Sequence, residues 1–216
     1  MALRLAVLVS GEGTNLQAIL DSVHGRYGIE VAGVAASRAE ARGLERAREA
    51  GVETEVFAPT DYGDRAARDR ALGDWLERHG VELVVLAGWM EILDSEFIRR
   101  FEGRVLNVHP SLLPSFPGIR AIERAIEHGV RVTGVTVHLV DEGVDSGPIV
   151  LQEALELAYD REVSEVERAV HAIEHRLLPR AIRLIAAGAV SLDPDHARRV
   201  RIDPSLDPEG AGGRDG

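Results

Sequence analysis

An amide and an imidazole lie two residues apart in the stretch NVHPSLLPSFPG, residues 107–118, which begins at the end of the apolar run RVLNV. Alternate residues of a strand face the same side, so Asn107 and His109 would point toward one place. Two N–H donors that converge in this way can stabilise a developing oxyanion. Prolines at 110, 114 and 117 would stiffen the loop that follows. The alternative is a histidine that is merely hydrogen-bonded within a turn.

Carboxylates gather in a second stretch, VDEGVDSGPI, which follows another predicted strand. It carries Asp141, Glu142 and Asp145 together with two glycines. A carboxylate beside His109 would orient the imidazole and raise its pKa. The alternative is a solvated acidic hairpin turn.

The glycine-rich stretch SGEGTN, residues 10–15, follows the first apolar run and precedes a predicted helix, with Thr14 and Gln17 spaced as a capping box. Glycines let backbone N–H groups approach an anion, and a helix start adds partial positive charge. A dinucleotide fingerprint is not met, because Leu16 stands at its third glycine position. The stretch favours a cradle for one phosphate group; the alternative is a tight turn that binds nothing.

Apolar side chains follow the fourth predicted strand in the stretch AGWMEIL. Trp89, Met90, Ile92 and Leu93 could line a slot for a flat aromatic ligand. Ordinary core beneath the next helix is the alternative.

The elements that must position these stretches alternate along the chain. Short apolar runs predict strands, and helical periodicity or helix-end signals predict helices. The predicted strands cover residues 3–10, 31–37, 53–58, 82–88, 104–108, 132–140 and 147–157, and the predicted helices cover 14–24, 42–51, 64–79, 94–101, 120–129 and 164–188. This order predicts an α/β, Rossmann-like fold with a mostly parallel sheet, helices on both faces and an antiparallel portion near the C-terminal strands. We expect one catalytic domain over residues 1–190 and a polar, partly disordered C-terminal tail over 191–216.

Composition excludes several kinds of chemistry. The chain of 216 residues has a net charge of -11, which argues against nucleic acid as an obligatory partner. It contains no cysteine and no lysine, so thiol, thiolate-metal and Schiff-base chemistry are excluded. No run is apolar enough to span a membrane, and we expect a cytoplasmic protein without a metal. His171 and His175 have the spacing of a helical metal site, but most such pairs are incidental.

Four stretches occur together in a familiar order: VLVSGEGTNLQAIL, NVHPSLLPSFPG, GVTVHLVDEGVDSGPIVLQE and AIEHRLLP. They resemble the phosphoribosylglycinamide formyltransferases, folate-dependent enzymes of purine biosynthesis, from residue 3 to about residue 190. The resemblance implies transfer of a formyl group from 10-formyltetrahydrofolate, a co-substrate, to the amine of glycinamide ribonucleotide. Only small-molecule substrates are implied as partners, and no metal.

The resemblance also implies residue roles. The catalytic residues would be Asn107, His109 and Asp145. The phosphate and ribose would bind at Gly11, Gly13, Thr14, Asn15 and Glu174. The folate would bind at Arg65, Met90, Glu91, Ile92, Leu93, Asn107, Val140, Asp141, Glu142, Gly143 and Val144. Glu91 departs from the basic residue of bacterial members, which suggests folate contacts through the backbone there.

The implied reaction is direct attack by the amine, because no thiol or lysine can carry the formyl group. Asn107 and a protonated His109 would donate hydrogen bonds to the tetrahedral oxyanion, and Asp145 would support the charged ring. A formyltetrahydrofolate hydrolase and a methionyl-tRNA formyltransferase are the alternatives with similar patterns, although each is expected to carry a further domain. A Rossmann oxidoreductase and a non-catalytic nucleotide-binding module are alternatives from other classes.

Overall fold

The computed structural model describes residues 2–158 and 162–207. Contacts between Cα atoms group the chain into two compact units, Met1–Asn107 and Val108–Gly216. Strand β5 contains the boundary between them. The single catalytic domain expected over residues 1–190 stays a prediction.

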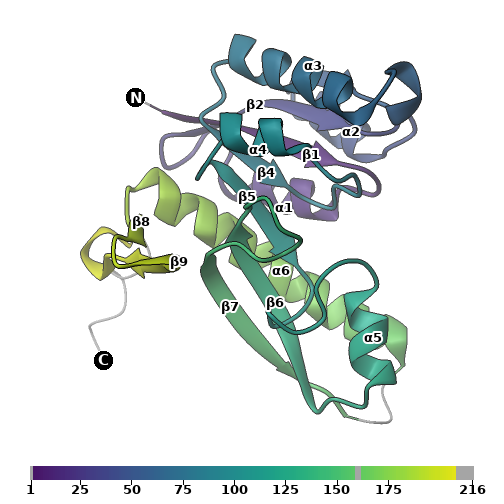
Figure 1. Cartoon of the computed structure of the whole chain (residues 1–216), viewed down its shortest axis with the longest axis vertical. Coiled ribbons are helices and arrows are strands. Elements are labelled where there is room, and N and C mark those ends of the chain that lie inside the picture. The colour runs from purple at the N-terminus through teal and green to yellow at the C-terminus, as the bar shows by residue number, and fades with distance from the viewer. Residues whose placement is uncertain (1, 159–161, 208–216) are drawn as a thin grey trace. The chain divides into compact units, whose positions relative to one another are not determined.

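The first unit is built on five parallel strands (Figure 1). Their order in the sheet is β3-β2-β1-β4-β5. The strands are β1 (Leu3–Val9), β2 (Ile29–Ala36), β3 (Thr54–Val56), β4 (Leu83–Leu86) and β5 (Val105–His109). The four residues of β4 and the last five of β1 are all buried, as expected of central parallel strands that are covered on both faces.

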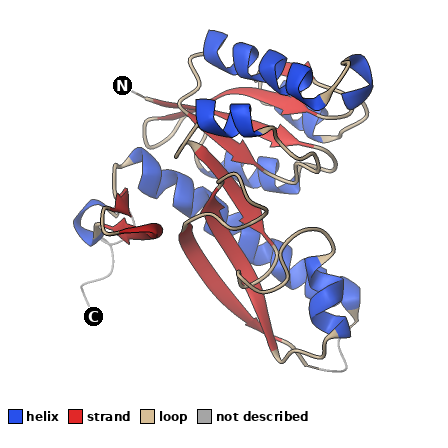
Figure 2. Cartoon of the chain, in the orientation of Figure 1, coloured by secondary structure: helices blue, strands red, loops and turns tan. Residues whose placement is uncertain are grey.

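Four helices accompany this sheet: α1 (Thr14–Ser22), α2 (Gly43–Glu49), α3 (Arg65–Arg78) and α4 (Ser95–Arg100). A 3-10 turn, η1 (Pro59–Asp61), precedes α3. Helix α1 packs against α2, and α3 packs against α4. The connections through α1 and α2 run along the sheet from β1 to β3, and those through α3 and α4 run in the opposite direction, from β3 to β5. Because such crossovers are right-handed, the two helix pairs lie on opposite faces (Figures 1 and 2). The strand order therefore reverses between β1 and β4, where ligands of such sheets bind.

The second unit is built on an antiparallel pair, β6 (Val132–Leu139) and β7 (Ile149–Glu156). Helix α6 (Val163–Ala186) packs on both strands and also contacts α5 (Ala121–Glu127). Its apolar side recurs at helical spacing, with Val166, Val170 and Ile173 among its buried residues. The predicted mostly parallel sheet with an antiparallel C-terminal portion is confirmed by these pairings, and all seven predicted strands and six predicted helices are present.

The C-terminal region differs from the predicted tail. Residues 190–206 contain β8 (Val190–Asp193), β9 (His196–Ile202) and the 3-10 turn η2 (Pro204–Leu206). Strands β8 and β9 pair antiparallel, and β9 also pairs with β7. Arginine-rich β9 lacks the apolar run of a buried strand, so its sequence resembled a solvated tail. The part of the predicted tail at 208–216 lies outside the described residues.

Length and hydropathy of the helices bear on membrane association. Within the described part of the chain, no helix is both long enough and apolar enough to cross a bilayer.

Candidate active site

Two loops of the first unit meet where the strand order reverses. The glycine loop, residues 10–13, leaves β1, and the apolar loop, residues 87–94, leaves the neighbouring strand β4. Ser10 N donates to Gly88 O at 3.0 Å, and Met90 N donates to Ser10 Oγ at 2.9 Å. The predicted phosphate cradle and the predicted aromatic slot therefore lie side by side.

The glycine loop depends on Gly13, which has a φ of 68° and precedes α1 as its N-cap. A Cβ on this residue would lie 2.6 Å from Gly43 Cα of α2, so glycine is required here for packing as well as for φ. The predicted capping box is wrong, since no side chain caps α1. Gln17 instead donates to Asp21 and accepts from Arg46.

Other residues predicted to contact the nucleotide differ in exposure. Gly11 is exposed, and a Cβ added to it would meet no atom within 4 Å, while Thr14 is half-buried and Asn15 is buried. Glu12, at the tip of the glycine loop, pairs with Arg42 at 3.0 Å. The ion pair partly neutralises a carboxylate that would otherwise oppose an anion at this loop.

The apolar loop turns Met90 and Ile92 outward, with 59% and 65% of their surface exposed. Leu93 is half-buried, and Arg65 lies exposed at the first residue of α3. Glu91 accepts from the guanidinium of Arg68 at 3.2 Å. Its side chain is thus engaged within the protein, and two apolar side chains on either side of it face outward.

In the second unit, His109 and Asp145 are in contact. His109 stands at the end of β5 with 5% of its surface exposed, and its Nδ1 lies 3.3 Å from Asp145 Oδ2. The same carboxylate oxygen accepts from Gly118 N at 2.7 Å, and Oδ1 lies 3.6 Å from Nε2 of buried His138. Asn107, half-buried, is the last residue of the first unit and stands two residues before His109 on β5.

Burial and charge have opposite effects on His109. Burial lowers its pKa below the ordinary value, although Asp145 and the Phe116 carbonyl favour the protonated ring. Asp145 raises the pKa of His109, as predicted, but its effect is smaller than that of desolvation, so the net shift is downward. Both ring nitrogens face acceptors, since Nε2 lies 2.9 Å from Phe116 O. When the ring is protonated, both of its N–H groups can therefore donate, one to Asp145 and the other to the Phe116 carbonyl.

Asp145 is ionised at neutral pH. Burial alone would raise its pKa, but hydrogen bonds from His138 and Gly118 and the charge of His109 lower it to about 2. Its backbone is left-handed, with a φ of 49°, as is that of Phe116, with a φ of 54°. Such conformations are costly outside glycine and persist where the surroundings enforce them. Here they aim a carboxylate and a carbonyl at one imidazole.

The proline loop, residues 110–118, is anchored to β6 and β7 by buried polar contacts. Thr136 Oγ1 donates to Ser111 O at 2.7 Å and accepts from Leu113 N at 3.1 Å. Gln152 Nε2 donates to Leu113 O at 2.9 Å. From α5, Arg124 donates to Pro117 O at 2.6 Å. The segment that bears the partner carbonyl of His109 is held at several points along its length.

The acidic loop, residues 140–148, is stabilised by its own first carboxylate. Asp141 Oδ1 accepts from Gly143 N at 3.1 Å and from Ser146 Oγ at 2.6 Å. Val140 is half-buried, whereas Glu142 and Val144 are exposed. Asp141 thus shapes the loop from which Asp145 extends.

Two groups on α6 complete the set of candidates. Glu174, predicted to contact the nucleotide, is 5% exposed. The rings of His171 and His175 stack with centroids 6.3 Å apart. Among the residues that the structure describes, no group of three or more His, Cys, Asp or Glu side chains could hold a metal ion.

Some site residues were not predicted. His138 and the Gly118 N–H both contact Asp145, and buried Arg68 contacts Glu91. The sequence does contain a signal for His138: it is a polar residue between the apolar Val137 and Leu139, at the end of β6 just before the acidic loop. The contacts of Arg68 and Gly118 join segments at least 23 residues apart, which the local sequence pattern does not reveal.

Comparison with known proteins places this geometry in a family. The model of a family described as formyl transferase matches residues 3–182. The chain belongs to this family. The phosphoribosylglycinamide formyltransferase of Haemophilus influenzae is 41% identical over 190 residues, which cover 88% of this chain and 90% of that protein. The predicted resemblance to the phosphoribosylglycinamide formyltransferases within the family is therefore confirmed.

Members of the formyl transferase family with known structures share the fold. Glycinamide ribonucleotide transformylase 1 from Symbiobacterium toebii superposes with a TM-score of 0.89 at 49% identity, covering 93% of this chain and 94% of that one. The trifunctional purine biosynthetic protein adenosine-3 of Bos taurus is 44% identical over 190 residues. The chain spans 19% of the length of that longer relative.

Proposed function

We propose that the chain transfers the formyl group of 10-formyltetrahydrofolate to the amine of glycinamide ribonucleotide in purine biosynthesis. The observation that carries the proposal is the contact between buried His109 and half-buried Asp145 on a chain of this family. The glycine loop would bind the phosphate through backbone N–H groups, and the apolar loop would bind the pterin against Met90 and Ile92. A cytoplasmic location stays a prediction.

The proposed chemistry begins with the neutral amine attacking the formyl carbon. A nitrogen–carbon bond forms, and the carbonyl electron pair moves to oxygen, which becomes an oxyanion. Asn107 donates a hydrogen bond to that oxygen. The bond from the formyl carbon to the folate nitrogen then breaks, and that nitrogen leaves with its electron pair and takes up the proton that His109 has accepted from the amine, which restores the neutral ring.

His109 takes the proton that the attacking amine loses. Burial keeps the resting ring neutral near pH 7, because the pKa of His109 lies below its ordinary value. The ring is thus prepared to act as a base rather than as the protonated donor first predicted. Asp145, ionised throughout, stabilises the imidazolium that forms, and the imidazolium in turn stabilises the oxyanion. Glu174 and the exposed residues of the acidic loop are proposed to contact the two substrates.

The hydrolase alternative uses the same residues with water as the nucleophile. An absorbance assay that follows loss of 10-formyltetrahydrofolate, with and without glycinamide ribonucleotide, separates the two. We expect turnover only when both substrates are present. Turnover at the same rate without the nucleotide would contradict the transferase proposal and support the hydrolase.

A further inference from the structure

A buried pair of opposite charges lies on α3, directly beneath the apolar loop. Arg68 and Asp69 are 2% and 1% exposed, and the guanidinium lies 2.7 Å from Asp69 Oδ1. No proposed step of formyl transfer uses either residue. Because burying charged groups is costly unless they are paired and hydrogen-bonded, the remaining partners of this pair are informative.

Arg68 contacts three residues of the apolar loop. Its guanidinium donates to Ile92 O at 3.0 Å and to Glu91 Oε2 at 3.2 Å. It also lies 5.8 Å from the centroid of the Trp89 ring, within the range of a cation–π contact. One cation therefore holds the backbone carbonyl of Ile92. It also contacts the side chains of Trp89 and Glu91, the two neighbours of Met90.

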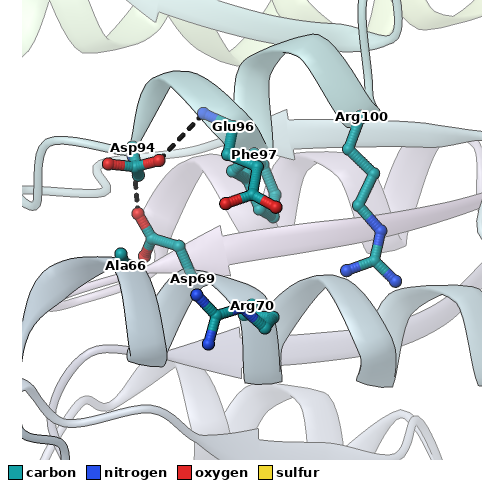
Figure 3. Close-up of a pocket in the computed structure, with 7 residues that line it drawn as sticks. All are labelled: Ala66, Asp69, Arg70, Asp94, Glu96, Phe97 and Arg100. Atoms are coloured by element: carbon teal, nitrogen blue, oxygen red, sulfur yellow. Dashed lines mark hydrogen bonds between the residues drawn. The ribbon is translucent and has the colours of Figure 1, made fainter.

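Asp69 holds the end of the same loop. Its Oδ2 accepts from Asp94 N at 2.6 Å, and Asp94 in turn caps α4 by accepting from Glu96 N at 2.8 Å. Figure 3 shows these two hydrogen bonds in sequence, from α3 through the loop to the first turn of α4. The loop is thus tied at its start by Ser10 and at its end by the buried pair.

We propose that Arg68 and Asp69 are positioning residues for the folate, which set the apolar loop so that Met90 and Ile92 face the pterin. This inference rests on the proposed function, since it assumes that the apolar loop binds the folate. It also assigns Glu91, whose acidic side chain serves as the partner of Arg68 within the protein and leaves folate contacts to the loop backbone.

Nucleotide binding should be insensitive to this pair. The glycine loop contacts the apolar loop at Gly88 and Met90, through bonds made by Ser10. Apart from the contact of Arg68 with the Trp89 ring, Arg68 and Asp69 bind the other end of the apolar loop through hydrogen bonds at Glu91, Ile92 and Asp94. Loss of the pair should therefore displace Ile92 while the glycine loop keeps its contacts.

The test is calorimetric titration of the full chain with tetrahydrofolate and, separately, with glycinamide ribonucleotide. We expect Arg68→Met to weaken tetrahydrofolate binding by about tenfold or more, with the nucleotide Kd within about twofold of wild type. Glu91→Gln, which keeps both buried charges, should weaken tetrahydrofolate binding by about threefold. Arg78→Met, on an exposed arginine of the same helix, is the matched control and should change neither Kd.

Arg68→Met alone leaves Asp69 buried and unpaired, so the double variant Arg68→Met/Asp69→Asn tests the same contacts without that charge. An unchanged tetrahydrofolate Kd in a folded double variant would overturn the inference, and so would equal weakening of both ligands. A wild-type chain that binds the nucleotide but no tetrahydrofolate would instead overturn the proposed function.

Discussion

The two units hold their candidate site residues in opposite ways. In the first unit the groups that would touch a ligand, Met90 and Ile92, are exposed, and the charges that hold them lie buried behind the loop. In the second unit the charged groups themselves, His109 and Asp145, are the candidates for chemistry; His109 is buried and Asp145 is half-buried. We infer that the apolar loop of the first unit serves folate binding, whereas the buried imidazole of the second unit lies in a desolvated environment suited to proton transfer.

The largest effect should follow from removing a group that stabilises the oxyanion, either Asn107 or the imidazolium of His109. We expect Asn107→Ala and His109→Ala each to lower kcat by ~10²–10³, because the charge they stabilise exists only in the transition state. Calorimetry should find both substrates still bound. Steady-state kinetics of each variant beside wild type provide the measurement. A loss of substrate affinity as large as the loss of kcat would show that these residues bind the substrate rather than stabilise the transition state.

The second effect concerns pH. Asp145→Asn removes a charge that favours protonated His109, so the pKa of His109 should fall further below its ordinary value. The rate at neutral pH should fall on the order of 10-fold, since the imidazolium loses its support. The acid limb of the pH–rate profile should move to lower pH.

An NMR titration of His109 in wild type and Asp145→Asn measures that shift directly. The pH dependence of the free energy of unfolding is a second measure of the Asp145 contacts. Asp145 has a folded pKa of about 2, below its unfolded value, so its contribution is present above pH ~4 and is lost as pH falls toward 2. An unchanged His109 pKa in the variant would remove Asp145 from the mechanism.

Much of the fold follows from local patterns, as the strands show. Buried parallel strands such as β1 and β4 are continuous apolar runs, and the loops after them are placed at one edge by the alternation of strand and helix. Strand β9 was missed because its residues are mostly charged and its pairing with β7 joins residues that are 50 apart. A turn signal, the Pro-Asp pair at 194–195, precedes it and could have indicated a hairpin.

The site was predictable to a different extent. Asn107, His109 and Asp145 carry chemistry in their residue types, so their stretches were recognisable. The sign of the His109 pKa shift was not, because it depends on how completely the ring is buried, and burial is a property of the packed structure. Arg68 could not be distinguished from the other arginines of its charged helix for the same reason.

A smaller effect, on stability, separates two glycines of the glycine loop. Gly13→Ala should lower the free energy of unfolding by ~1–3 kcal/mol, because the new Cβ meets Gly43 and the φ is left-handed. Gly11→Ala, with open space around it, should leave stability unchanged and weaken nucleotide binding alone. Chemical denaturation and calorimetry make the comparison, and equal stability of the two variants would contradict the packing role of Gly13.

The smallest effect is expected from the C-terminal end. Removing residues 208–216 should keep kcat within about twofold of wild type, since the segment is polar and rich in glycine. The cut spares Asp207, whose carboxylate lies 3.2 Å from Arg180 of α6. A truncation that begins at 190 is the contrasting variant, because it also removes Arg198, which donates to Ser146 O beside Asp145. A large loss of activity in the shorter truncation would contradict this expectation.

The division between binding and chemistry is tested most directly by single-turnover formyl transfer at saturating 10-formyltetrahydrofolate. Arg68→Met should regain a rate within about twofold of wild type, because added folate compensates for a weakened slot. Asp145→Asn should stay slow on the order of 10-fold at any folate concentration, because its defect lies in the transition state. Recovery of both variants, or of neither, would contradict the division of roles between Arg68, which positions the folate loop, and Asp145, which supports the chemical step.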